Sequence, residues 1–406
     1  MKIIHIADLH FGKALHGRSL IGDQREWAER FISFAAAERP DAVVIAGDVY
    51  DRAAPSAEAV ELLDFFLTGL LSACAGASVM VVAGNHDSGP KLAFGASLLS
   101  RERLFIAGRT LPRMMNVELE DRYGKVLFWL MPYTFPAAIS EALGEEAAER
   151  GYTASVRRYL EAQCVDASAR NVLVAHQSVS FAGREPENGG SETMIGGIGS
   201  IDGSVFGDFD YVALGHIHKA QHVGRDSMRY AGSPLAYHFD ETRWPTKGAV
   251  VVELLEKGRV EVRFAEIESP CPLRVVEGPF DAIIEAESSS APRRECVKIV
   301  LTDRRANPAD CERLRAIFAA KGASVLEISS SFRSLSSVSP SSEARRERTL
   351  SEMFEDFWAA RHDGARPDDG TLALVRLAAG MVDSCSVSPE ADAAAIADLA
   401  AGRAEP

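Results

Sequence analysis

Five apolar runs of this sequence are each followed by polar side chains. The runs cover residues 2–7, 42–46, 78–83, 172–175 and 211–214, and their richness in β-branched residues predicts buried strands. In an open α/β sheet, the carboxyl ends of the strands lie together and form the place where ligands bind. We therefore expect these polar residues to meet in space: Asp8, His10, Asp48, Asp51, Asn85, His86, Asp87, His176, His216 and His218.

The segments between and after these runs predict the fold class. Apolar residues recur at helical spacing within 27–34 and 60–70, so helices alternate with strands, as in layered sheets with crossover connections. From about residue 171 the pattern is mostly strand-like, including 249–254 and 260–265. These patterns predict an α/β fold of two mixed sheets flanked by helices, which spans 1–267.

The rest of the chain is expected to form three smaller parts. A proline-containing break near residue 268 opens a small α+β domain, 268–328, with strands at 273–276 and 297–301 and a helix at 309–321. Serine is dense in the next stretch, which predicts a flexible linker over 329–345.

The last part, 346–406, is expected to form C-terminal helices. Its apolar residues Leu350, Met353, Phe354, Phe357 and Trp358 fall on one face of a helix. Such a face binds a partner or packs back onto its own domain, and the sequence leaves both possibilities open.

The composition is that of an ordinary globular protein, with 47% hydrophobic and 25% charged residues. Six scattered cysteines without a CxxC pair indicate reduced thiols, and no apolar stretch approaches the ~20 residues of a membrane helix. Without a signal peptide, the expected location is the cytoplasm. The net charge of −14 argues against a generally basic nucleic-acid-coating protein, although a local basic patch and bound cations can offset phosphate charge.

The first two polar clusters are carboxylate-rich. Asp8 and His10 lie two residues apart at a strand end and can point the same way, although such a pair alone is usually surface decoration. Asp48 alone would fit a turn or a helix N-cap. Together with the other clusters, a carboxylate at Asp48 indicates a bridge between two cations held ~3.5–4 Å apart.

The tetrapeptide Gly84-Asn85-His86-Asp87 is the most specific motif. Its glycine permits a tight exit from the strand, and Asn85 offers a neutral carbonyl ligand. His86 can stand beside the cations and protonate a leaving alkoxide or stabilise negative charge. We expect the Asp51 carboxylate to orient His86 and raise its pKa; a simple turn is the alternative reading of the tetrapeptide.

Strand-end histidines complete the set, at His176, His216 and His218. An Asp/Asn/His set without thiolates suits Mn²⁺, Fe²⁺ or Zn²⁺. Two such ions can clamp a phosphoryl oxygen, activate a water and stabilise an in-line displacement, so no nucleophilic Ser or Cys is needed. The predicted chemistry is metal-assisted hydrolysis of a phosphate ester.

The order of these motifs resembles that of the calcineurin-like metallophosphoesterases over about residues 1–265. The details are most similar to bacterial nuclease subunits of this family. They are Ile-Ala-Asp-Leu-His-Phe-Gly at 6–12, Gly-Asp-Val-Tyr-Asp-Arg at 47–52, Tyr-Val-Ala-Leu-Gly-His-Ile-His-Lys at 211–219 and Tyr-Ala-Gly-Ser-Pro at 230–234.

The resemblance implies two sets of ligands that share Asp48, and a histidine that acts without binding metal. One cation is held by Asp8, His10, Asp48 and His218, and the other by Asp48, Asn85, His176 and His216. His86, assisted by Asp51, is the implied catalytic residue, and Arg52 and Ser233 are the expected substrate contacts.

The resemblance also implies two Mn²⁺ ions and a DNA exonuclease and endonuclease that acts on ends and hairpins in repair and recombination. It implies a homodimer within a heterotetramer, with a coiled-coil ABC-type ATPase as partner. The small domain would cap the DNA, and the C-terminal helices would bind the ATPase.

Two other functions fit the same motifs. A small-molecule or cyclic-nucleotide phosphodiesterase could use the same centre, but it would not need the about 140 residues that follow the first domain. A binding scaffold without catalysis is the second alternative, and the complete ligand set argues against it.

Overall fold

The chain divides into two compact units, Met1–Phe332 and Arg333–Pro406. The computed structural model describes most of the first unit and only short stretches of the second. The described residues are 1–144, 151–188, 199–331, 354–355, 358–359, 365–368, 370–372 and 375.

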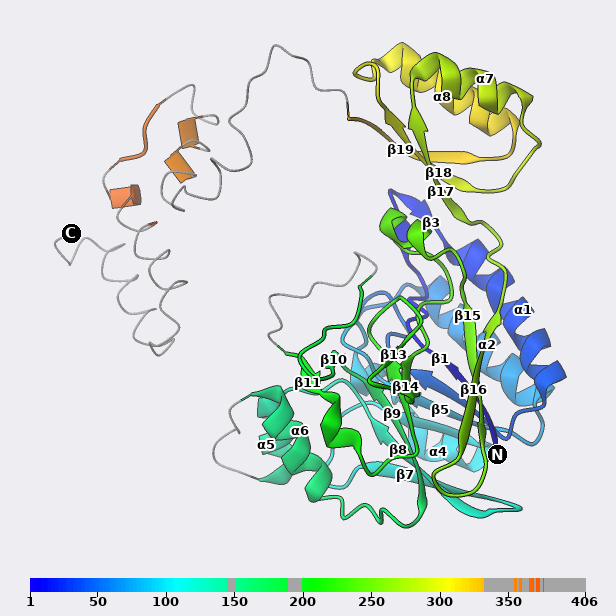
Figure 1. Ribbon diagram of the computed structural model, residues 1–406, viewed down its shortest axis with the longest axis vertical. Coiled ribbons are helices and arrows are strands. Elements are labelled where there is room, and N and C mark those ends of the chain that lie inside the picture. The colour runs from blue at the N-terminus through cyan, green and yellow to red at the C-terminus, as the bar shows by residue number, and fades with distance from the viewer. Residues whose placement is uncertain are drawn as a thin grey trace. The chain divides into compact units, whose positions relative to one another are not determined.

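Two six-stranded mixed sheets form the centre of the first unit (Figure 1). In the first sheet, β1, β4, β5 and β6 run parallel, and β15 pairs antiparallel with both β1 and β16. Its order is β16 (Val260–Glu266), β15 (Gly248–Leu254), β1 (Lys2–Ile6), β4 (Ala42–Ala46), β5 (Ser78–Val82) and β6 (Leu104–Ala107).

In the second sheet, β8, β9, β12 and β14 run parallel, and β7 and β13 are antiparallel edge strands. Its order is β13 (Gln221–Val223), β14 (Arg225–Tyr230), β12 (Tyr211–Gly215), β9 (Arg170–His176), β8 (Gly124–Met131) and β7 (Met115–Asp121). The prediction of two mixed sheets flanked by helices is confirmed.

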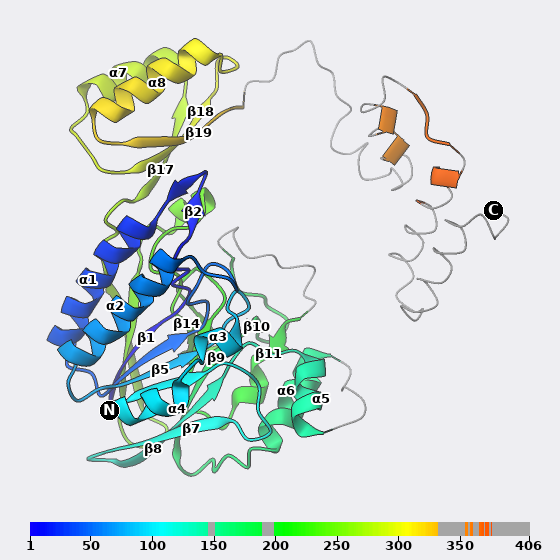
Figure 2. The same cartoon turned by 180° about the vertical axis from the view of Figure 1, so that it is seen from behind.

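The two sheets pack face to face through one apolar core, to which both contribute fully buried residues such as Val44 and Val174. Helices α1 (Ile21–Glu38) and α2 (Ala57–Ala73) cover the other face of the first sheet (Figure 2). In α1, Trp27 and Phe31 are four residues apart, and their rings stack 5.1 Å apart against that sheet. Helices α5 (Pro136–Leu143) and α6 (Tyr152–Glu161) cover the second sheet, so the two sheets and these four helices form a four-layer sandwich.

Short elements lie in the loops of the sandwich. Two pairs of two-residue strands occur there, β2 (Ala14–Leu15) with β3 (Arg18–Ser19), and β10 (Val179–Ser180) with β11 (Ile201–Asp202).

The small domain has a more specific arrangement than the α+β unit expected. Its three strands are parallel and alternate with two helices over a separate apolar core. The elements are β17 (Leu273–Gly278), α7 (Phe280–Ser289), β18 (Cys296–Leu301), α8 (Pro308–Ala320) and β19 (Ser324–Ser330).

The small domain contains two elements that were not predicted, and one of them extends into the expected linker. The expectation did not include α7 or β19. Ser329 and Ser330, which were expected in the linker, pair with Val300 and Leu301 of β18. Strand pairing uses backbone groups that every non-proline residue has, so serine density alone does not exclude a strand.

Little of the expected linker and C-terminal helices is described. Phe354 and Trp358 are helical, and their rings lie 5.8 Å apart, as expected for residues four apart on one helix face. Leu350, Met353 and Phe357 lie outside the described residues, as does the linker from 332 onward. Among the helices described, none is long and apolar enough to cross a membrane.

Candidate metal centre

The predicted site residues lie where five strands of the two sheets end. Asp8 and His10 follow β1, Asp48 follows β4, and Asn85 and His86 follow β5 of the first sheet. The second sheet contributes His176, the last residue of β9, and His216 and His218, which follow β12.

Strained backbone marks the same positions. Positive φ angles occur at Asp8 (55°), His10 (45°), Asp48 (49°) and His216 (106°). Residues with a Cβ atom rarely adopt this conformation, and such strain concentrates at functional sites. The loops therefore hold these side chains inward at a conformational cost.

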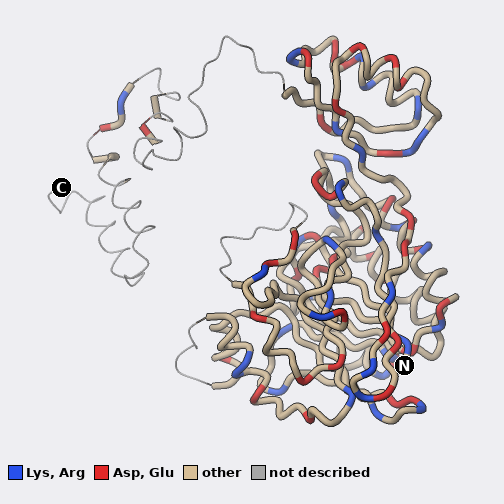
Figure 3. The backbone as a smooth tube through the Cα atoms, viewed as in Figure 1, with Lys and Arg blue, Asp and Glu red and all other residues tan. Residues whose placement is uncertain are grey.

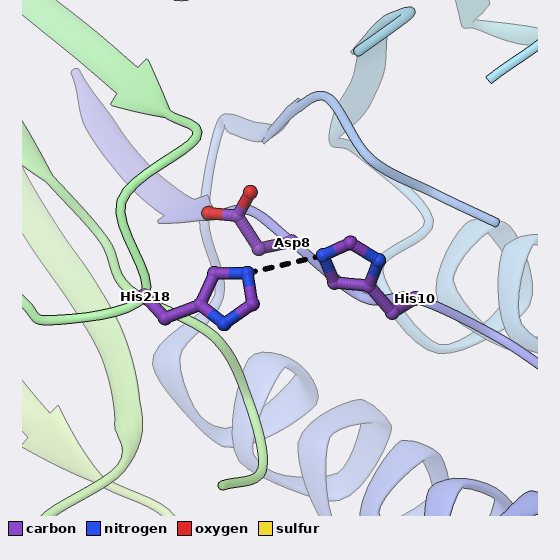
Figure 4. A group of neighbouring side chains, drawn as sticks. All are labelled: Asp8, His10 and His218. Carbon is purple, nitrogen blue, oxygen red and sulfur yellow. Dashed lines mark hydrogen bonds between the residues drawn. The ribbon is translucent and has the colours of Figure 1, made fainter. Parts of the chain in front are cut away.

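The first group consists of Asp8, His10 and His218, whose ligand atoms lie within 4.8 Å of one another (Figure 4). The two Nε2 atoms of His10 and His218 are 3.1 Å apart, so both rings direct a nitrogen at the same point. All three side chains are buried. Two imidazole nitrogens and a carboxylate that converge in this way form a donor set for a divalent cation.

The second group consists of Asp8, Asp48 and His176. Asp48 Oδ2 lies 3.4 Å from His176 Nε2 and 3.6 Å from His10 Nε2, so this carboxylate faces both groups. Asn85 Oδ1 lies 3.0 Å from His176 Nε2 and 3.1 Å from His216 Nδ1. The structure thus brings all seven predicted ligands together, with Asp48 in the middle.

Hydrogen bonds behind the ligands fix the orientation of two imidazole rings. His176 Nδ1 donates to the carbonyl oxygen of Ala46 at 2.8 Å. His218 Nδ1 is 3.2 Å from Glu241 Oε1, to which it donates. Because Nδ1 is engaged in both rings, Nε2 is the nitrogen that faces the centre and is left to bind a cation.

At two positions beside the centre, only glycine fits, because a Cβ atom would clash with a ligand side chain. A Cβ atom on Gly84 would lie 2.1 Å from Asp48 Oδ1, and one on Gly47 would lie 2.3 Å from His176 Nδ1. The tight exit predicted at Gly84 is thus needed because the Asp48 side chain packs against its backbone.

The electrostatics of the cluster suit cations. Burial raises the pKa of Asp8 to about 6, against the opposing effect of His176 and His218. Burial lowers the pKa of His216 to about 3 and that of His10 well below its usual range, so both rings are neutral at pH 7. Buried carboxylates need compensating charge, and neutral imidazoles have lone pairs to donate. The residues present therefore fit two divalent cations.

His86 lies at the edge of the cluster, with its ring 4.8 Å from that of His10 and perpendicular to it. Its Nδ1 atom donates to the backbone oxygen of Asp51 at 2.9 Å. The backbone of Asp51 therefore holds this ring, and a carboxylate oxygen of Asp51 also lies within 4.8 Å of a His86 nitrogen. Orientation of the ring by that carboxylate stays a prediction. The carboxylate itself accepts from Lys13 Nζ at 2.7 Å.

The two expected substrate contacts differ in exposure. The Arg52 side chain is 79% exposed beside Asp51 and is open to a ligand. Ser233 is buried, and its hydroxyl donates to Leu235 O at 2.8 Å and accepts from Lys247 Nζ at 2.9 Å. The expectation for Ser233 does not hold in this structure, because its polar group already has buried partners.

Three residues that organise the centre received no role from sequence reasoning. Asp87 accepts hydrogen bonds from the backbone nitrogens of Val49, Tyr50 and Gly84, and so ties the Asp48 loop to the His86 loop. Its place in the tetrapeptide was the available signal. Glu241 and Lys247 lie behind His218. Neither belongs to a recognisable sequence motif, so the sequence offered no signal for their role.

Comparisons with known proteins identify the family. Residues 1–220 match the family model described as "Calcineurin-like phosphoesterase". The SbcD protein of the nuclease SbcCD from Staphylococcus saprophyticus is 32% identical over 287 residues, which cover 70% of this chain and 74% of that protein. The chain belongs to the SbcD family of calcineurin-like phosphoesterases.

Other relatives extend the comparison. The SbcD protein of Staphylococcus epidermidis is 30% identical over 70% of this chain and 74% of its own length. Residues 270–362 match a model described as "Type 5 capsule protein repressor C-terminal domain". Among solved structures, TT1561 of Thermus thermophilus is similar, with a TM-score of 0.39 and 13% identity over 65% of this chain and 98% of that one.

Proposed function

We propose that this chain is a DNA nuclease that hydrolyses phosphodiester bonds with two divalent cations held by oxygen and imidazole donors. The position of Asp48 between two ligand groups carries the proposal, because a bridging carboxylate is what a two-cation phosphodiesterase requires. The staphylococcal relatives, which are named as nuclease subunits, support DNA as the substrate.

The proposed ligands of one Mn²⁺ are Asp8, His10, Asp48 and His218, and those of the other are Asp48, Asn85, His176 and His216. Bound there, the two cations would supply an activated water and offset the negative charge of the phosphate.

His86 is the proposed proton donor to the leaving oxygen. Its Nδ1–H is held by the Asp51 carbonyl, so a proton on Nε2 is the one that can be transferred. Arg52, exposed on the same loop, is the proposed contact to a DNA phosphate. Ser233 has no part in this proposal.

The proposal includes exonuclease and endonuclease action at DNA ends and hairpins, in repair and recombination in the cytoplasm. Acidic and basic residues are interspersed along the first unit (Figure 3), so DNA contact would rest on the cations and on local basic residues. The small domain is the proposed DNA cap, and the C-terminal helices are the proposed site for an SbcC-like coiled-coil ABC-type ATPase.

We further propose a homodimer within a heterotetramer. In the segment that carries α3 (Gly89–Leu92) and α4 (Ala96–Leu99), Phe94 is 86% exposed and Leu98 is 70% exposed. Large exposed apolar side chains close together are typical of interaction surfaces.

A nuclease assay with Mn²⁺ tests the function. The wild-type protein is expected to degrade linear DNA and to leave cyclic nucleotides intact. His86→Ala should lower the rate by at least about 100-fold while both cations stay bound, because only the proton donor is lost. The matched control is His222→Ala, because His222 is an exposed histidine in β13. This variant should keep the wild-type rate.

Three results would contradict this proposal. Hydrolysis of cyclic nucleotides without DNA cleavage would indicate a small-molecule phosphodiesterase. A wild-type protein that binds no metal would indicate a scaffold. Undiminished DNA cleavage by His86→Ala would remove His86 from the mechanism.

A further inference from the structure

A buried polar network lies behind His218, on the side of the ring that faces away from His10. Glu241, in η3 (Phe239–Arg243), and Lys247 are both buried. Glu241 Oε1 accepts from His218 Nδ1 at 3.2 Å and from the backbone nitrogen of Tyr237 at 3.2 Å. The carboxylate is thus fixed against the histidine that faces the metal centre.

Lys247 holds both this carboxylate and the backbone of the histidine. Its Nζ donates to Glu241 Oε2 at 2.6 Å, to Ser233 Oγ at 2.9 Å and to His218 O at 3.1 Å. An ammonium group has three N–H donors, and each of them has a buried acceptor here. The ion pair leaves no uncompensated charge, so it can stay buried.

The two ligand groups differ in what stands behind their histidines. His176, in the second group, donates through Nδ1 to the neutral carbonyl of Ala46, whereas His218 in the first donates to a carboxylate. A carboxylate behind an imidazole fixes the tautomer and makes the metal-facing nitrogen more basic than a neutral acceptor does. This difference provides a means to tune one cation position separately from the other.

We propose that Glu241, supported by Lys247, is a positioning residue for His218 and strengthens cation binding at the His10/His218 position selectively. This inference rests on the proposed two-cation centre. Glu241 and Lys247 belong to neither of the two ligand groups.

The test is isothermal titration calorimetry of the full-length protein with Mn²⁺. The wild type is expected to show two binding events. In Glu241→Gln one event should weaken by about 10–100-fold and the other should stay unchanged, because only His218 loses its carboxylate. Glu287→Gln is the matched control: this buried glutamate pairs with Arg274 in the small domain, and both events should persist.

A second variant distinguishes the loss of the contact between Glu241 and His218 from a general destabilisation of the fold. Glu241→Gln leaves Lys247 buried without its charged partner, which could unfold the protein. Glu241→Gln combined with Lys247→Met removes both charges together and should fold, and the same single event should remain weakened. Circular dichroism and thermal melting check the fold of each variant.

The outcomes separate this inference from the proposed function. Absence of binding in the wild type would overturn the two-cation centre itself. Two unchanged events in folded Glu241→Gln would overturn the role of Glu241 and leave the centre intact. Wild-type affinity in the double variant would assign the effect to the stranded lysine charge and would also overturn the inference.

Discussion

The Asp48 carboxylate contacts a histidine of each ligand group and the backbone of His86. Its Oδ2 atom faces His10 and His176 at 3.6 and 3.4 Å, and its Oδ1 atom accepts from the backbone nitrogen of His86 at 2.9 Å. Burial would raise the pKa of Asp48, but the charge of His176 and its hydrogen bond to this carboxylate outweigh burial and hold that pKa well below its usual range. The side chain is therefore an anion that both ligand groups share.

Asp48→Asn is expected to weaken both Mn²⁺ binding events, whereas Glu241→Gln weakens one. The amide keeps the size of the side chain but removes the shared negative charge, and we expect a loss of at least about tenfold at each position. Calorimetry with Mn²⁺ measures both. If one event kept its wild-type affinity, Asp48 would not be the bridge.

Among the secondary-structure elements, strands β7 and β9 are joined by a charged contact at one end of the second sheet. Arg170 of β9 donates to Asp121 of β7 through Nη2 at 2.5 Å and through Nη1 at 3.2 Å, and the terminal ammonium of Met1 lies 2.6 Å from the same carboxylate. Burial alone would raise the pKa of Asp121, but these two positive groups outweigh it and hold the pKa well below its usual range.

The depressed pKa gives this contact a defined pH dependence. A carboxyl group whose pKa is lower in the folded state stabilises the protein above its unfolded pKa, near 3.8, and that stabilisation is lost as the pH falls further. Asp121→Asn should lower the free energy of unfolding at pH 7 by about 2–3 kcal/mol. The gap between wild type and variant should narrow below about pH 4.

Urea denaturation at a series of pH values measures this effect. Asp226→Asn is the control, because the Asp226 side chain is 84% exposed and its loss should change stability by less than about 0.5 kcal/mol. A gap between wild type and Asp121→Asn that stays constant down to about pH 2 would contradict the assignment.

For the molecule as a whole, the small domain is anchored to the sandwich by charged side chains. Arg294, which precedes β18, donates to Asp23 of α1 at 2.6 Å, and Arg18 donates to the same carboxylate at 2.6 Å. Asp23 is buried, whereas the Arg294 side chain is 52% exposed, so only the carboxylate side of this contact is shielded from solvent. The small domain therefore has a defined attachment beside α1.

The proposed homodimer would have Phe94 and Leu98 in its interface. Phe94→Asp combined with Leu98→Asp should convert a dimer to a monomer, because two charges would have to be buried in the interface. Size-exclusion chromatography with light scattering measures the mass. Val275→Asp, at a 40% exposed apolar position in β17, should leave the mass unchanged. A monomeric wild type, or a double variant that stays dimeric, would contradict this interface.

Much of the fold could be predicted because it depends on local pattern. The five apolar runs became β1, β4, β5, β9 and β12, since a fully buried strand requires a continuous apolar stretch. Helix α7 and strand β19 were not predicted. Strand β19 is half-buried and serine-rich at its end, so its sequence resembles that of a loop, and pairing with β18 decides its structure.

The order of motifs along the chain was enough to predict which side chains gather at the metal centre, because parallel strands deliver the residues that follow them to one edge. The atoms of those residues that meet could not be predicted without the three-dimensional packing. His86 donates to the Asp51 carbonyl, Ser233 is buried, and Glu241 supports His218. These contacts join segments without a fixed spacing in the chain, so they depend on how loops of the two sheets pack together.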